Sequence, residues 1–143
     1  MKNLIYLFIL TLGIISCSSD DETRIDNSDL IGSWNWTNTD GGIGFHIHET
    51  PETTGKIILL NLNKNYEYSV TENETEISNG VYELIMKKSI YSGEMERFIK
   101  LQTIDQQYLE FVKNGIVQID QNENLNISDN NVDGIRSKFV RTE

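Results

Sequence analysis

Two histidines, His46 and His48, have the spacing that most directly suggests metal chemistry, and they are the only histidines in the chain. In an extended segment, residues i and i+2 face the same side, so both imidazoles could bind one metal ion while Glu49 points to the other side. Two ligands make a weak site, and any third ligand would have to be a distant carboxylate. We therefore expect a polar loop with incidental histidines and no metal site.

The segment Asp129–Gly134 matches the first half of a calcium-binding loop, with the pattern Asp-x-Asn-x-Asp-Gly. Its twelfth position is Val140, where such a loop needs a bidentate glutamate, and the flanking segments have strand patterns. The pattern therefore excludes an EF-hand and predicts a tight polar turn. It leaves open whether Asp129, Asn131 and Asp133 bind an ion.

Acidic residues alternate at Glu72, Glu74 and Glu76, with Glu67 and Glu83 on neighbouring predicted strands. Paired carboxylates could perform glycosidase chemistry, but nothing in the sequence indicates that two of them are buried together. A solvated strand edge is the expected arrangement. The chain has no nucleophile elbow, P-loop or dinucleotide fingerprint. We therefore predict a protein that is not an enzyme, with no catalytic residues and no cofactor.

Cys17 is the only cysteine in the chain. It follows a basic start and a mostly apolar stretch, Leu4 to Ile15, which is typical of a secretory signal. This stretch is about half as long as a helix that crosses a bilayer. The residues Ile14-Ile15-Ser16-Cys17 resemble the bacterial lipoprotein box, which implies removal of residues 1–16 and a stable membrane anchor of acyl chains on Cys17. The alternative is an ordinary cysteine near a conventional cleavage site.

Residues 17–29 are polar and acidic, and they predict a flexible tether between the lipid and a single domain at residues 30–143. Their acidic run resembles the surface-export signal of Bacteroidetes-type lipoproteins, with a plain charged linker as the alternative. The resemblance implies a lipid-anchored protein of the cell envelope, at the outer membrane and exposed on the cell surface if the run is such a signal. The formal net charge of −10 argues against nucleic acid as a partner.

From Leu30 onward, short β-rich segments alternate with turn-forming residues. About nine strands at short spacing favour an all-β antiparallel barrel or sandwich. Asn114-Gly115 is the clearest predicted hairpin turn, because both residues tolerate the positive φ of a type I′ turn. After a first strand around Trp34, the predicted strands are Lys56–Leu62, Tyr66–Val70, Val81–Met86, Arg97–Thr103, Tyr108–Val112, Ile116–Asp120, Asn124–Ser128 and Ile135–Arg141.

Gly32-Ser33-Trp34 matches the Gly-x-Trp that opens lipocalin barrels, and the order of later turns and strands, down to Phe139-Val140-Arg141, is similar to small lipocalin-like lipoproteins of the Bacteroidetes type. The resemblance implies an antiparallel up-and-down barrel of about eight to nine strands. It also implies that Gly32, Trp34 and Arg141 close one end, with the guanidinium stacked on the indole. The domain is shorter than a typical lipocalin and has no cysteine for the disulfides that many lipocalins carry.

Four aromatic residues, Trp36, Tyr66, Tyr68 and Tyr82, are candidates for the wall of a ligand cavity, and a packed core would use the same residue types. Tyr66 and Tyr68 are expected to point inward, and the loop Gly41–Gly55 is expected to cover or flank one mouth of the barrel.

Two functions follow from these alternatives. The first is non-enzymatic binding of a small apolar or amphipathic ligand inside an open barrel. The second is an interaction or structural role of a solid barrel, with an envelope protein as the partner, either as a binding module or as an inhibitor. The barrel interior decides between them.

Overall fold

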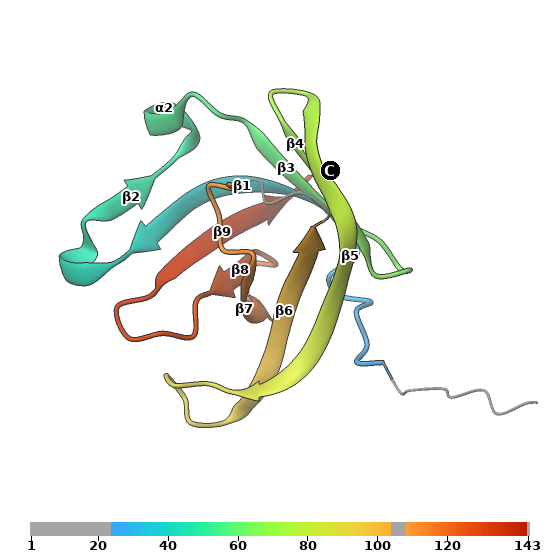
Figure 1. Cartoon of the computed structure of the whole chain (residues 1–143), viewed down its shortest axis with the longest axis vertical. Helices are drawn as coiled ribbons and strands as arrows, with labels where there is room; N and C mark the ends of the chain where they lie inside the picture. The colour runs from blue at the N-terminus through green and yellow to red at the C-terminus, as the bar shows by residue number, and fades with distance from the viewer. Residues whose placement is uncertain (1–23, 104–107, 143) are drawn as a thin grey trace, which may run out of the picture.

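The computed structural model describes residues 24–103 and 108–142, which form a closed antiparallel β-barrel (Figure 1). Each strand pairs with its neighbour in the sheet, and pairing of the first strand with the last closes a ring of eight strands, to which β2 is added. The predicted all-β antiparallel barrel is therefore confirmed. The strands are β1 (Gly32–Gly41), β2 (Ile47–Glu49), β3 (Ile58–Leu62), β4 (Glu67–Glu72), β5 (Thr75–Lys88), β6 (Met95–Thr103), β7 (Asn114–Ile119), β8 (Leu125–Ser128) and β9 (Ile135–Arg141), with the short helices η1 (Ile43–Phe45) and α2 (Pro51–Thr54).

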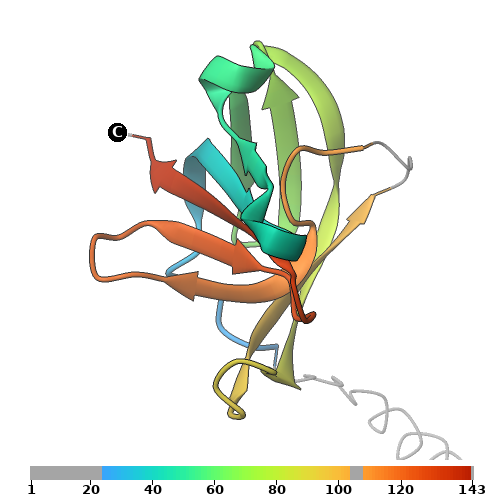
Figure 2. The same cartoon turned by 90° about the vertical axis from the view of Figure 1, so that its left-hand side faces the viewer.

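Strand β1 organises the barrel because it pairs with three other strands. It lies against β9 along most of its length, against β3 through Gly32–Asn35 and against β2 through Thr39–Gly41. The small strand β2 therefore takes the edge of β1 that β3 leaves free. Figure 2, which views the molecule from the side on which β1 ends, shows η1 and β2 in front of the barrel.

Side chains alternate between the two faces of each strand, so every second side chain points into the interior of the barrel. On β3, Ile58, Leu60 and Leu62 are buried, whereas Leu59 and Asn61 lie on the outer face and are only partly covered. The inward side chains of all eight barrel strands form one apolar cluster. Burial of each large aliphatic side chain contributes about 1.5–3 kcal/mol, so this cluster is the main source of stability.

The predicted hairpin turn at Asn114-Gly115 is wrong. Both residues belong to β7, where they pair with Lys100 and Ile99 of β6. A Cβ atom on Gly115 would collide with the backbone carbonyl of Ser128. The glycine is therefore required by the close approach of two strands and not by a turn.

The prediction that Glu72, Glu74 and Glu76 alternate along one strand edge is also wrong. Glu74 lies in the turn between β4 and β5, where Asn73 and Glu74 have φ angles of 50° and 68°. Two consecutive residues with positive φ are typical of the tight turn that joins twisted antiparallel strands. Asn79 and Gly80, which the sequence placed ahead of a strand, lie inside β5 instead.

The predicted strand Tyr108–Val112 is wrong as well. This segment forms no strand, and Leu109, Phe111 and Val112 are buried in the apolar cluster of the barrel. Its apolar residues resemble a strand in composition, but their side chains fill the interior of a ring that the other strands already close. We call residues 109–112 the plug.

Candidate functional site

Trp34 and Arg141 lie together where β1 begins and β9 ends. Trp34 is fully buried, and its Nε1 donates to the carbonyl of Leu30 at 2.8 Å. The guanidinium carbon of Arg141 lies 4.1 Å from the centroid of the Trp34 ring, so the predicted contact is present. Arg141 also donates to the carbonyls of Ile31 and Asp29, at 2.7 Å and 2.9 Å. The pair therefore ties the first and last strands to the chain that precedes β1.

Gly32 has a specific role in this contact. A Cβ atom at this position would collide with Nη1 of Arg141, and the φ of 145° is itself unfavourable for other residues. The glycine leaves the space through which the guanidinium reaches the indole. All three residues that the sequence assigned to this end, Gly32, Trp34 and Arg141, are thus in one place.

The residues just before β1 strap this end of the barrel. The buried Asn27 donates to the Tyr82 hydroxyl at 2.6 Å and to the Asn63 carbonyl at 3.1 Å. Arg97 donates two hydrogen bonds to the Asp29 carboxylate, at 2.7 Å and 2.6 Å. These bonds hold the pKa of Asp29 below its usual value. Residues 24–29 therefore pack against the barrel, although the sequence assigned them to the flexible tether.

The four candidate ligand residues do not line one cavity. Trp36 and Tyr68 are buried inside the barrel, and Tyr82 is buried near the strap formed by residues 24–29. Burial raises the pKa of the Tyr82 hydroxyl. Tyr66 is half-buried at a turn position with φ of 62°, and its ring centroid lies 5.5 Å from that of Tyr82. Only Tyr66 and Tyr82 are brought together, beside a surface hollow of about 540 Å³ that Arg24 also lines.

The plug fills the opposite part of the interior. Leu109, Phe111 and Val112 are 3–7% exposed, and the Phe111 ring meets the Phe139 ring edge to face at 5.3 Å. Because these side chains join the same cluster as the inward residues of the strands, the barrel is solid at this level. Sequence reasoning found these apolar residues but assigned them to the wall of the barrel.

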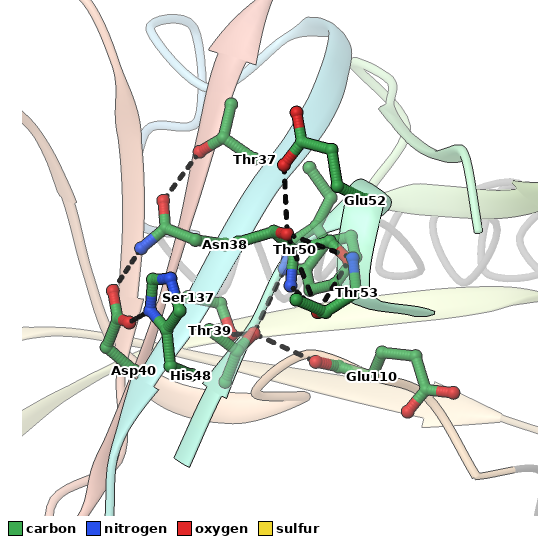
Figure 3. Close-up of polar contacts among 11 residues, drawn as sticks. Thr37, Asn38, Thr39, Asp40, His48, Thr50, Glu52, Thr53, Glu110 and Ser137 are labelled. Carbon is green, nitrogen blue, oxygen red and sulfur yellow. Dashed lines mark hydrogen bonds and ion pairs between the residues drawn. The ribbon is translucent and has the colours of Figure 1, made fainter. Parts of the chain in front are cut away.

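Two buried hydroxyls hold the plug to the wall. The Thr39 hydroxyl donates to the Glu110 carbonyl at 2.8 Å, as Figure 3 shows. It also accepts from Trp36 Nε1 at 3.0 Å. It also lies 2.8 Å from the Ser137 hydroxyl, which accepts from the Val112 backbone N–H at 2.9 Å. Residues 109–112 lie outside the strands, so these side chains pair polar backbone groups that burial would otherwise leave without a partner.

A lysine links the plug to the rim. Lys56 pairs with the Glu110 carboxylate and lies 3.2 Å from the Glu72 carboxylate. Glu110 first, and Glu72 second, raise the pKa of Lys56. Lys56 directly follows the segment Gly41–Gly55, so this pairing places the end of that segment beside the plugged mouth of the barrel. The prediction from the sequence was that this segment covers or flanks one mouth.

A chain of polar side chains runs along the outer face of β1 (Figure 3). The Thr37 hydroxyl donates to Asn38 Oδ1 at 2.9 Å, and the Asn38 amide donates to the Asp40 carboxylate. The other carboxylate oxygen of Asp40 pairs with Nδ1 of His48 on β2. Each residue of this hydrogen-bonded series therefore orients the side chain of the next.

The two histidines have separate partners. His46 Nδ1 lies 2.7 Å from the Ile43 carbonyl, whereas His48 pairs with Asp40. Within residues 24–103 and 108–142, no three histidine, cysteine, aspartate or glutamate side chains gather closely enough to hold a metal ion.

The predicted polar turn after β8 is present. Asn131 donates to the Asp129 carboxylate at 2.6 Å, and Asp133 has a φ of 58°. The Tyr91 hydroxyl lies 2.9 Å from both the Asp129 and Asn131 carbonyls, so the β5–β6 loop is fastened to this turn.

Together these features define a small closed β-barrel that is filled inside and carries oriented polar side chains outside. In the part of the chain that the structure covers, no helix is long and apolar enough to cross a bilayer. The predicted signal segment at residues 1–16 and Cys17 lie outside the described residues. Comparison of the chain with protein-family models, curated proteins and solved structures finds no match.

Proposed function

We propose that the protein is a non-enzymatic lipoprotein of the bacterial cell envelope that works as an interaction module through the outer surface of its barrel. The observation that carries this proposal is the plug. Leu109, Phe111 and Val112 occupy the interior that a ligand would need, so recognition is left to outer surfaces.

The anchor in this proposal is a set of acyl chains on Cys17, with location at the outer membrane and exposure at the cell surface. The lipoprotein-like pattern around Cys17 supports the anchor, and the closed barrel with its Trp34–Arg141 contact supports a lipocalin-like domain. The strap at residues 24–29 and the connection between β1 and β2 lie on opposite sides of the barrel (Figure 1). Because the chain enters the barrel through this strap, a lipid at Cys17 would leave the β1–β2 side accessible.

A second candidate function is binding of a small apolar or amphipathic ligand. The hollow beside Tyr66 and Tyr82 supports it, because about 540 Å³ lies within the usual size range of ligand pockets. A ligand inside the barrel itself would have to displace the plug.

The anchor is tested with Cys17→Ser. We expect the variant to lose incorporation of an alkyne-labelled fatty acid and to move from the membrane fraction to the soluble fraction. Thr23→Ser, outside the lipoprotein box, is the control and should keep both label and location. A Cys17→Ser protein that still takes up label and sediments with membranes would remove the anchor from the proposal.

The solid interior is tested by native mass spectrometry of the protein extracted from membranes. The expected spectrum shows the acylated chain without a further bound molecule. Phe111→Ala serves as the positive control, because it opens space inside the barrel and should retain added benzene. An apolar molecule that copurifies with the unaltered chain would favour the ligand-binding function instead.

A further inference from the structure

A second surface hollow, of about 470 Å³, lies on the outer face of β1 and β9, beside the connection between β1 and β2. Its volume falls within the usual range of small-molecule sites. Its lining is mixed. Asn38, Asp40, Arg136 and Lys138 provide polar groups, and Phe45 and Tyr91 provide aromatic rings.

Arg136 is available for an anionic ligand. It lies directly opposite Asp40 in the β1–β9 register, yet the Asp40 carboxylate is bound by Asn38 and His48. Arg136 forms no ion pair with any residue of the ranges 24–103 and 108–142. In a chain with 22 acidic and 12 basic residues, an arginine that leaves the facing carboxylate to other partners keeps its guanidinium open to an external anion.

Lys138 adds a second cation on the same face, because residues two apart on a strand point the same way. Its Nζ lies 4.0 Å from Asp120 Oδ2, at the limit of an ion pair. That carboxylate is held mainly by Asn124, whose side-chain and backbone hydrogen bonds are the largest causes that lower the Asp120 pKa to about 2. Arg136 and Lys138 both line the hollow, so a carboxylate bound there would have two cations beside it.

Both aromatic residues of the hollow are exposed, and hydrogen bonds fix the Tyr91 hydroxyl and the backbone of Phe45. Phe45 is 87% exposed and Tyr91 61% exposed. The Tyr91 hydroxyl is fastened to the β8–β9 turn, and Phe45, at a φ of 54°, donates its backbone N–H to the Gly42 carbonyl at 3.0 Å. Exposed rings beside a polar floor suit stacking on another ring and not burial of a fully apolar molecule.

We propose that this hollow binds a sugar ring that carries a carboxylate. Arg136 and Lys138 would bind the carboxylate, Asn38 and Asp40 would bind ring hydroxyls, and Phe45 and Tyr91 would pack on the faces of the ring. The charge of Asp40 beside Arg136 favours a singly charged carboxylate over a doubly charged phosphate. The assignment rests on the proposed role of the outer surface.

The test is isothermal titration of the full chain, in a detergent without a sugar headgroup, with digalacturonic acid and with its neutral dimethyl ester. We expect the acid to bind about tenfold more tightly than the ester, because a charged hydrogen-bonded pair is lost with the ester. Arg136→Met should remove this preference. Lys100→Met, which removes an exposed cation on the outer face of β6, is the matched control and should leave it unchanged.

Phe45→Ala should weaken binding of the acid and the ester by the same factor, and Tyr108→Ala, which removes an aromatic ring outside the hollow, should not. Equal affinities for acid and ester, equal effects of Arg136→Met and Lys100→Met, or no binding at millimolar concentration would overturn the proposal. Binding of N-acetylphenylalanine as tightly as the acid would also overturn it, by showing that the ligand is an apolar carboxylate.

These outcomes are separable from the proposed function. Failure of the titrations leaves the solid interior and the lipid anchor untouched, since native mass spectrometry and fatty-acid labelling test those. An apolar molecule found inside the barrel would remove the interaction proposal while leaving the titration of the outer hollow informative.

Discussion

The two ends of this barrel are closed in different ways. Where β1 begins, the strap at residues 24–29 and the stacked Trp34–Arg141 pair cover the end, and their contacts join residues more than a hundred positions apart in the chain. At the other end, the plug enters the interior without forming a strand and depends on the hydroxyls of Thr39 and Ser137. The first end is closed by the strap and a stacked pair on two neighbouring strands, and the second by a segment outside the strands that two wall hydroxyls hold.

This difference has a consequence for dynamics. Backbone groups in a ladder resist local opening together, whereas a segment held by a few side-chain bonds opens more easily. We therefore expect the plug to exchange its amide hydrogens faster than β1 and β9, and four substitutions test this difference between the two ends.

The largest expected effect is at Trp34. Trp34→Ala should lower the free energy of unfolding by about 3–5 kcal/mol, because a fully buried indole is replaced by a void. Denaturant unfolding followed by circular dichroism measures this loss. Tyr108→Ala, at a 75% exposed ring, should cost little. A Trp34→Ala protein as stable as the Tyr108→Ala protein would show that the stacked pair does not hold this end.

Phe111→Ala should cost about 3 kcal/mol, at the lower end of the range for a buried aromatic, because an irregular plug can collapse partly into the space. The variant should also bind benzene, which the unaltered barrel should not. Calorimetric unfolding with and without benzene measures both effects. Equal stabilisation of both proteins by benzene would mean that the interior is not filled.

Ser137→Ala should cost about 1–3 kcal/mol, because it leaves the buried Val112 N–H without an acceptor. Hydrogen exchange should show the loss concentrated at residues 109–112. Ser33→Ala, which removes a hydroxyl on the outer face of the same barrel, is the control and should change neither stability nor exchange much. Uniform acceleration over all strands would contradict a separate role for the plug.

The smallest effect concerns the Asp29–Arg97 pair at the strapped end. The folded-state pKa of Asp29 is lowered mainly by the hydrogen bonds from Arg97, so its contribution is present above the unfolded pKa of about 3.9 and is lost as pH falls through the folded value. Unfolding curves of the native protein and Asp29→Asn should therefore differ at pH 6 and converge as the pH falls below about 4.

Because the pair is partly exposed, this difference is small. When Arg97 is already replaced in Arg97→Gln, adding Asp29→Asn should change stability at pH 6 much less than it does in the native protein. A pH dependence that survives in that background would assign the effect to another partner of Asp29.

Much of the barrel wall could be predicted from the sequence. The predicted bounds of Ile135–Arg141 match β9, and the predicted strand Lys56–Leu62 contains β3, although its apolar residues on both faces left the inward face open. The Gly32–Trp34 motif also predicted the contact with Arg141, because its resemblance to lipocalins implies that this tryptophan packs against an arginine of the last strand.

The plug and the outer hollow could not be predicted in the same way. Tyr108–Val112 has the composition of a strand, and only the closed ring leaves it no edge to pair with, so its side chains go inside. The hollow takes Asp40 from β1, Arg136 from β9 and Tyr91 from the β5–β6 loop. Nothing in the sequence brings these residues together, because their proximity depends on strand register and barrel closure.

Residue types and turn spacing along the chain were therefore enough to predict an antiparallel barrel wall, since strand formation depends on local properties, and the resemblance to lipocalins added the contact at one end. Tertiary structure decided whether the barrel is hollow or filled and where polar groups converge. Those properties depend on which apolar segments compete for one limited interior and on which outer side chains remain unpaired after the barrel has closed.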